Sequence, residues 1–212
     1  AIFITGTAGS GKSALTSRLI QWYKDNKAFP VSLNLDPGSY KLPYEPDVDV
    51  RDYVEVNTLM DKYDLGPNGS LVMASDLIAT RLDDIQTEVN ELNPDYVIID
   101  TPGQIELFAF RASGPYFVTN FQADNKASVF VFDGMLVSSP INFISISLLS
   151  TAVKLRLKTA QVNALTKRDL LLERLQEILS WSTSNTSLEK SLDNEKDIEY
   201  SCLLYTYPSP RD

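Results

Sequence analysis

Residues Gly6–Ser13 constrain the fold more than any other stretch of the sequence. They read G-T-A-G-S-G-K-S and fit the pattern G-x-x-x-x-G-K-S/T, a loop that wraps around phosphate groups. Glycines suit such a loop because they let the backbone curl until several N–H groups point inward at an anion. The apolar run Ile2–Thr5 predicts a buried strand before the loop, and Leu15 and Leu19 predict a helix after it. Together the three parts predict binding of a nucleoside triphosphate.

The residues at the end of the loop have separate predicted roles. The ammonium group of Lys12 is expected to reach the β- and γ-phosphates, and the Ser13 hydroxyl to coordinate Mg²⁺. The start of the helix adds its dipole and its unpaired N–H groups. The residues expected to contact the phosphates are Gly9, Ser10, Gly11, Lys12, Ser13 and Ala14.

The composition argues against several other classes of function. With 212 residues, 43% of them hydrophobic, the chain is large enough for one globular domain with a sizeable core. A net charge of −9 argues against a nucleic-acid or anionic-membrane surface, since those partners require basic clusters. The chain has no histidine and a single cysteine, which argues against a zinc site, Ser-His catalysis and an internal disulfide. No apolar run is long enough to span a membrane and no signal peptide precedes the first strand, so we expect a cytoplasmic protein.

A carboxylate follows the second predicted strand, Pro30–Leu35. This residue, Asp36, stands at the carboxyl end of a strand beside the phosphate loop, where α/β sheets bind ligands. It either faces the metal ion and the attacking water or forms the turn before Pro37 and Gly38, and the sequence leaves both open. A second charged cluster is expected to be solvated and to cap a helix. Its members are Asp47, Asp49, Arg51 and Asp52.

Two helices are predicted next, over residues 51–63 and 70–92. The segment Leu65–Gly69 between them reads L-G-P-N-G and predicts a rigid loop, because proline fixes φ and glycine permits left-handed geometry. The longer helix has an apolar stripe that recurs every three or four residues. The stripe consists of Ile78, Leu82, Ile85, Val89 and Leu92.

The strand predicted over residues 96–99 ends in the sequence D-T-P-G-Q. An aspartate after a hydrophobic strand, downstream of a phosphate loop, is the arrangement that holds Mg²⁺, and Asp100 takes that place. Gly103 would let its N–H approach the γ-phosphate. Gln104 is placed where a side-chain amide can orient a water for in-line attack.

The remaining pattern predicts strands over 128–133 and 159–165 and a helix over 170–179. Residues 139–158 fit both strand and helix spacing, and their length favours a helix. Residues 180–196 predict a solvated loop or a loose helix, and residues 197–201 the beginning of a last strand. Strands that alternate with helices predict an α/β, three-layer P-loop NTPase fold, a mostly parallel sheet with helices on both faces.

The choice of base is predicted to lie in Thr166–Asp169, which reads T-K-R-D. The Asp169 carboxylate would accept hydrogen bonds from guanine N1–H and N2–H, and the stem of Lys167 would cover the purine ring. A site built for these donors leaves a carboxylate unpaired when adenine binds, which is costly.

These motifs together make the chain resemble the GPN-loop GTPases over nearly all of residues 1–169. The motifs that carry the resemblance are Gly6–Ser13, Asn34-Leu35-Asp36-Pro37, residues 42–47 (L-P-Y-E-P-D), Gly66-Pro67-Asn68, residues 100–104 (D-T-P-G-Q) and Thr166–Asp169. The resemblance implies a Mg²⁺-dependent GTPase that acts as a homodimer or, in eukaryotes, a heterodimer. It also implies that Gly66, Pro67 and Asn68 of one subunit reach the phosphates bound by the other.

The resemblance further implies that Asp36, Gln104 and Glu106 surround the hydrolytic water, with Lys12 and Asn68 completing the catalytic set. Asn68 is neutral, so it lacks the charge of an arginine finger, and slow turnover is expected. Two departures stand out. Thr166 occupies a position where the family usually has Asn, and the last guanine-loop element, expected near Ser201, is missing.

Three alternatives remain open. A partitioning-type P-loop ATPase would place a lysine at the second loop position, where this chain has Thr7. A nucleotide kinase would need an arginine-rich lid segment. The third alternative is a nucleotide-gated assembly scaffold that holds a client protein, with hydrolysis incidental.

The expected domain organisation is a single P-loop GTPase domain over residues 1–201, incomplete at its C-terminus. Residues 202–212 match the translation of a transposase-end sequencing adapter at every position except Tyr207. We therefore expect that tail to be non-native and leave it out of the fold prediction.

Overall fold

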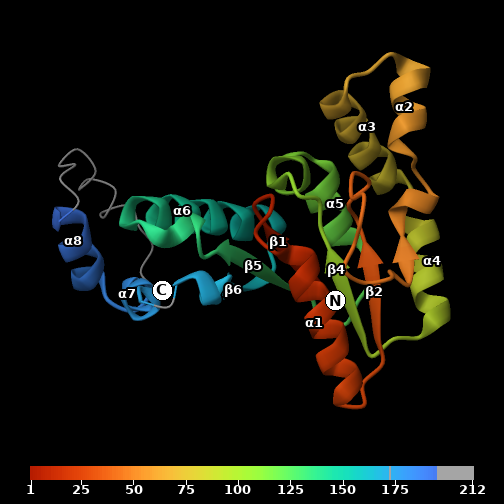
Figure 1. The fold of residues 1–212 in the computed structure, drawn as a ribbon. Coiled ribbons are helices and arrows are strands. Elements are labelled where there is room, and N and C mark those ends of the chain that lie inside the picture. Colours follow the sequence, from red (N-terminus) through yellow and green to blue (C-terminus); the bar gives the residue numbers. More distant parts are fainter. Residues whose placement is uncertain (172, 195–212) are drawn as a thin grey trace.

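A six-stranded sheet forms the centre of the protein, a computed structural model that describes residues 1–171 and 173–194 (Figure 1). The strand order is β3-β2-β4-β1-β5-β6, and every pair of neighbours is parallel. The strands are β1 Ile2–Gly6, β2 Pro30–Asn34, β3 Val48–Asp49, β4 Tyr96–Asp100, β5 Ala127–Asp133 and β6 Ala160–Thr166. The α/β fold and the parallel sheet predicted from the alternation of patterns are confirmed.

Helices connect the strands. The α-helices are α1 Lys12–Asp25, α2 Val56–Tyr63, α3 Pro67–Thr80, α4 Leu82–Leu92, α5 Ser113–Asn120, α6 Pro140–Leu157, α7 Leu175–Trp181 and α8 Asn185–Asn194. Shorter turns are the 3₁₀ segments η1 Val50–Asp52, η3 Leu136–Ser138 and η4 Arg168–Leu171, and the π-helical turn η2 Glu106–Phe110. The ambiguous segment 139–158 is thus a helix, α6, as its length predicted.

Neighbouring residues on the central strands face opposite layers. Phe3 and Ile99 belong to the large core that the sheet shares with α3, α4, α5 and α6. Ile4 and Ile98 belong to a smaller core that Ile20 of α1 covers. Side chains of a strand alternate between its two faces, so both faces of the sheet are buried. Helices therefore lie on both faces, as expected.

The prediction of a single long helix over residues 70–92 is wrong. The segment is two helices, α3 and α4, separated at Arg81, whose φ of −96° and ψ of 10° are not helical. Most of the predicted stripe is buried, but Leu92 is 39% exposed. The pattern runs on across the break because both helices pack on the same core, so periodicity alone did not locate it.

Three other predictions need correction. Residues 51–63 form η1 and α2 rather than one helix, and β3 precedes them. Asp49 is buried at 9% exposure, so the charged cluster is not uniformly solvated. Part of 180–196 is the helix α8, whose Leu188 and Leu192 pack in the large core. The last strand predicted at 197–201 and the tail 202–212 lie outside the described residues.

Within residues 1–171 and 173–194, no helix combines the length and the apolar character that crossing a bilayer requires.

Candidate nucleotide-binding site

The predicted site residues other than Gly66, Pro67 and Asn68 lie at the carboxyl edge of the sheet or in the loops that follow its strands. β1, β2 and β4 are parallel neighbours, so their carboxyl ends lie side by side. The loop after β1 leads to Lys12, the loop after β2 begins near Asp36, and β4 ends at Asp100. The pairing Asn34↔Asp100 places the last two loops next to each other. This edge is where open parallel sheets bind ligands.

The glycine loop has the geometry that its sequence predicts. Gly6 has a φ of 148°, and a Cβ there would lie 2.8 Å from the carbonyl oxygen of Val131. Gly11 immediately precedes α1 with a left-handed φ of 96°. Both positions exclude an ordinary side chain, because L-residues rarely adopt these angles. The loop therefore turns tightly from β1 into the N-terminus of α1.

Lys12 folds back over this loop. Its Nζ donates hydrogen bonds to the carbonyl oxygens of Gly6, at 3.1 Å, and Thr7, at 2.9 Å. Burial lowers the pKa of the ammonium group, while the carboxylates of Asp100 and Asp36 act in the opposite direction. This buried cation, which donates to two loop carbonyls and lies near two carboxylates, is well placed to contact an incoming polyanion.

Asp100, predicted as a metal ligand together with Ser13, is buried beside that serine. Burial raises the pKa of its carboxyl group, and hydrogen bonding from the hydroxyls of Ser13 and Tyr44 and the charge of Lys12 partly offset that effect. Oδ2 accepts a hydrogen bond from the Tyr44 hydroxyl at 3.2 Å. Oδ1 is buried and makes no hydrogen bond of standard geometry with any described residue.

These oxygens fit a magnesium ion, which prefers oxygen ligands and retains several waters. Among residues 1–171 and 173–194, no three acidic, cysteine or histidine side chains form a metal-binding cluster. A metal ion between Ser13 and Asp100 would therefore take most of its ligands from phosphate and water. That is the usual manner of magnesium at nucleotide sites.

Asp36 forms the turn that the sequence allowed and also contacts the segment after β4; its predicted role toward the metal ion and the attacking water stays a prediction. Its Oδ1 accepts a hydrogen bond from the N–H of Gly38 at 2.9 Å. Its Oδ2 accepts one from the N–H of Gly103 at 3.2 Å. Gly103 in turn approaches the glycine loop, since a Cβ there would lie 3.9 Å from the Cβ of Ala8.

Gln104 and Glu106 follow at the same edge, in the segment that leads into η2. Gln104 is half-buried, and its carbonyl oxygen accepts a hydrogen bond from the N–H of Leu107 at 3.0 Å. Glu106 is exposed and begins η2. A single π-helical turn is rare and is often found at functional sites.

The predicted base-binding element is tied to the glycine loop. The Thr166 hydroxyl lies 2.7 Å from the carbonyl oxygen of Ser10 and 3.1 Å from that of Phe132. Lys167 has a φ of 54°, and its Nζ lies 2.7 Å from Oδ2 of Asp133. Asp169 is exposed in η4.

Gly66, Pro67 and Asn68 are exposed and lie apart from the glycine loop. Gly66 precedes α3 and Pro67 is its first residue, so the predicted loop is the start of a helix. Proline suits that position because its missing N–H would have no helical partner. In Figure 1 this turn stands at the outer end of the α2–α3 pair, which projects from the sheet.

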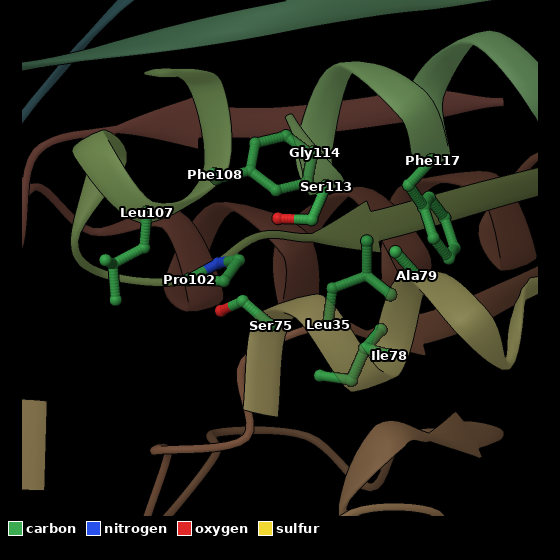
Figure 2. A pocket seen from close by; sticks show the side chains of 10 residues that line it. All are labelled: Leu35, Ser75, Ile78, Ala79, Pro102, Leu107, Phe108, Ser113, Gly114 and Phe117. Carbon is green, nitrogen blue, oxygen red and sulfur yellow. The ribbon is translucent and has the colours of Figure 1, made fainter. Parts of the chain in front are cut away.

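A small cavity separates α3 from the segment after β4 (Figure 2). Its volume is about 20 Å³, and Ser75, Pro102, Phe108 and Ser113 are among its lining residues. The Ser75 hydroxyl donates to the carbonyl oxygen of Leu71 at 2.9 Å. The Ser113 hydroxyl is buried and has no partner among the described residues.

Sequence reasoning did not single out Tyr44 and Asp133, which contact the predicted site residues Asp100 and Lys167. Asp133 ends a strand beside the phosphate loop, the same signal that identified Asp36, and could have been found that way. Tyr44 lies in an irregular loop between β2 and β3, where no periodicity indicates which side chain points inward.

Comparison with known proteins gives one family. Residues 4–208 match a family model described as "Conserved hypothetical ATP binding protein". GPN-loop GTPase 1 of Dictyostelium discoideum is 35% identical over 198 residues, which are 92% of this chain and 49% of that protein. GPN-loop GTPase PAB0955 of Pyrococcus abyssi is 34% identical over 178 residues, 83% of this chain and 70% of that protein.

The fold matches a solved structure as well. The crystal structure of PAB0955 from Pyrococcus abyssi, described as a GTPase in apo form, has a TM-score of 0.85 and 30% sequence identity. The match covers 98% of this chain and 83% of that one. The chain spans about half the length of GPN-loop GTPase 1 from Dictyostelium discoideum, at 49%, and from Saccharomyces cerevisiae, at 51%.

Proposed function

The chain belongs to the GPN-loop GTPase family, and we propose that it binds GTP and hydrolyses it in a Mg²⁺-dependent reaction. The observation that carries this proposal is the convergence of Lys12, Asp36 and Asp100 on the glycine loop. Lys12 bonds to the loop, and both carboxylates act on its charge. A buried cation, a buried carboxylate and a curled glycine backbone at a helix N-terminus are the parts that phosphoryl transfer needs.

In the proposed reaction Lys12 exchanges the carbonyl oxygens of Gly6 and Thr7 for phosphate oxygens. Gly9, Gly11, Ser13 and Ala14 would direct N–H groups toward the same phosphates, and Ser10 would do so after its N–H leaves the carbonyl oxygen of Thr7, to which it donates at 3.2 Å. Ser13 and Asp100 would hold a magnesium ion, whose positive charge would neutralise the phosphate oxygens. The protein's contribution is positioning and charge stabilisation.

We assign the attacking water to Asp36, Gln104 and Glu106. The Asp36 carboxylate already accepts one hydrogen bond on each oxygen, but each oxygen has a second lone pair for a water. Gln104 would orient the water. The Gly103 N–H, which donates to Asp36 Oδ2 in this structure, would turn to the γ-phosphate and leave that carboxylate oxygen to accept from the water. Glu106 is exposed and takes the outermost place of the three.

Guanine is proposed as the base. Asp169 is exposed and free to accept from guanine N1–H and N2–H, and Lys167 lies beside it with its ammonium on Asp133. The family description names ATP, whereas the relatives are called GTPases. A direct comparison of the two nucleotides is therefore the first experiment.

That experiment measures multi-turnover phosphate release and nucleotide affinity for GTP and ATP, with Mg²⁺ or with EDTA. We expect release from GTP with Mg²⁺, and little with ATP or with EDTA. Lys12→Ala should lower the rate by about 100-fold or more, since it removes a charge that stabilises the transition state. Arg18→Ala, on the exposed side of α1, is the matched control. Equal rates with ATP and GTP would contradict guanine selection.

We further propose a homodimer in which Gly66, Pro67 and Asn68 of one subunit approach the phosphates of the other. The support is their exposure at the turn between α2 and α3, which in Figure 1 stands at the outer end of that helix pair. Asn68→Ala should then lower turnover with little loss of nucleotide affinity. Mixing it with a Lys12→Ala chain should restore part of the activity, because one site of the mixed dimer has both residues. Unchanged turnover would remove this turn from the mechanism.

Because Asn68 is neutral and cannot supply the charge of an arginine finger, we expect slow hydrolysis of GTP. A slow rate suits a molecular switch that assembles a client protein. With one cysteine and no internal disulfide, we place that switch in the cytoplasm.

A further inference from the structure

The segment between β2 and β3 crosses the nucleotide edge and contacts Asp100 through one side chain. Tyr44 is half-buried and packs against the core that contains Ile4 and Ile98. Its hydroxyl donates to Oδ2 of Asp100 at 3.2 Å. The Ser17 hydroxyl of α1 lies 3.4 Å from the carbonyl oxygen of Pro43, which anchors the same segment. Tyr44 is thus fixed at both its ring and its hydroxyl.

This contact makes the two oxygens of Asp100 unequal. Oδ2 accepts the hydrogen bond from Tyr44, whereas Oδ1 is buried and accepts none of standard geometry from the described residues, although the Ser13 hydroxyl lies close enough to act on the same carboxylate. A carboxylate with one oxygen held cannot rotate freely, so the other oxygen keeps a constant direction. Partners of this kind orient a metal ligand without touching the metal.

We propose that Tyr44 is a positioning residue for Asp100, whose hydroxyl holds Oδ2 so that Oδ1 remains directed at the magnesium ion and its waters beside Ser13. This inference rests on the proposed function, because it assumes that Mg²⁺ accompanies the nucleotide. It adds to that function a residue from the segment between β2 and β3. Tyr44 also links that segment to β4.

Two other roles for Tyr44 make different predictions. If the ring serves only to cover the core, loss of the hydroxyl will leave metal binding unchanged. If the hydroxyl instead blocks the site and must be displaced, its loss will tighten metal binding. Positioning alone predicts weaker metal binding with unchanged metal-free nucleotide binding.

The test is Tyr44→Phe, which keeps the ring and removes the hydroxyl. Tyr53→Phe is the matched control, because the Tyr53 hydroxyl also donates to a carboxylate, Glu88, at 2.5 Å, but on α4. The affinity of a fluorescent GDP analogue is measured in EDTA and across a Mg²⁺ titration. Circular dichroism and the thermal midpoint confirm that each variant is folded.

We expect Tyr44→Phe to match the wild type in EDTA and to need about tenfold more Mg²⁺ for the same gain in affinity, the usual scale for losing such a partner. Tyr53→Phe should follow the wild type throughout. Tyr44→Leu should show the same shift, because leucine also lacks the hydroxyl, while its apolar side chain still covers the core. A Mg²⁺ titration of Tyr44→Phe that overlays or precedes the wild type would overturn the positioning role. A wild-type protein whose affinity ignores Mg²⁺ would instead overturn the magnesium of the proposed function, and Tyr44 with it.

Discussion

One hydroxyl group, that of Thr166, joins the base side of the site to the glycine loop. It lies 2.7 Å from the carbonyl oxygen of Ser10. Thr166→Val keeps the shape and removes this hydrogen bond, worth about 0.5–1.5 kcal/mol net. We expect GDP affinity to fall by about three- to tenfold, measured by titration of a fluorescent analogue. Thr166→Ser, which retains the hydroxyl, should bind like the wild type, and equal affinity for the Val variant would contradict the link.

A second hydroxyl, that of Ser113, lowers the stability of the fold. It is buried at the cavity of Figure 2 without a partner among the described residues. Burying an unpaired hydroxyl is unfavourable, so Ser113→Ala should raise the free energy of unfolding by about 1 kcal/mol in a urea titration. Ser75→Ala is the control, because its hydroxyl is bonded to Leu71 and should give no gain. A loss of stability in the Ser113 variant would mean that a water in the cavity satisfies the group.

For single residues, the sequence predicts those that a local motif or the end of a strand identifies. Lys12 belongs to a fixed pattern, and Asp100 ends an apolar strand, so both could be placed before any coordinates. Tyr44 could not be placed, because an irregular loop has no period from which to infer a direction. Asp36 could be located but not assigned, and its hydrogen bonds with Gly38 and Gly103 show that it forms a turn and contacts the segment after β4.

At the scale of elements, the joint between β3 and η1 depends on one carboxylate. Asp49 accepts hydrogen bonds from the Arg51 side chain and backbone and from Asn34. Burial alone would raise the pKa of Asp49, but these hydrogen bonds outweigh it and lower that pKa below its ordinary 3.8. The joint is therefore held by an ionised group.

The sign of the pH dependence follows from that lowered pKa. Asp49 binds a proton more readily in the unfolded chain than in the folded one. The ionised carboxylate therefore stabilises the fold fully above the ordinary pKa of 3.8, and this stabilisation is lost as the pH falls through the folded pKa. Asp49→Asn should destabilise the protein clearly at about pH 7 and much less at about pH 3. Urea unfolding at the two pH values measures this. An equal loss at both values would show that shape, not charge, holds the joint.

Element types were more predictable than element boundaries. The continuous apolar stripe predicts one helix over 70–92 because α3 and α4 present it to the same core, and nothing in the pattern indicates the break at Arg81. β3 has only two residues, too few to form an alternating pattern. The helix α5 was not predicted, since Gly114 and Pro115 lie in its first turn and are typical of loops.

At the scale of the whole molecule, alternating patterns predict a parallel sheet but not its strand order. The order β3-β2-β4-β1-β5-β6 depends on which strands pair across long distances in the chain, and no local pattern contains that information. The same holds for α8. Its sequence is polar and charged, yet Leu188 and Leu192 reach the core under α6. Two apolar side chains in a polar stretch are too few to be recognised without the partner surface.

The two tryptophans make the attachment of this last helix measurable. Trp181 is fully buried against Phe143, and its Nε1 donates to the Ser191 hydroxyl of α8 at 3.0 Å, whereas Trp22 is 56% exposed. In a Trp22→Phe background, fluorescence therefore reports the α6–α7–α8 packing alone. Leu188, with no exposed surface, lies in the same core.

We expect Leu188→Ala in that background to lower the free energy of unfolding by about 2–5 kcal/mol, the range for truncating a buried leucine. If α8 belongs to the same cooperative unit as the sheet, Trp181 fluorescence and far-UV circular dichroism will shift together in urea. Glu189→Ala, the exposed neighbour, is the control and should change little. Loss of the Trp181 signal at low urea while the dichroism remains would show that α7 and α8 unfold separately from the sheet. The glycine loop, Asp36 and Asp100 would then be held by the sheet without them.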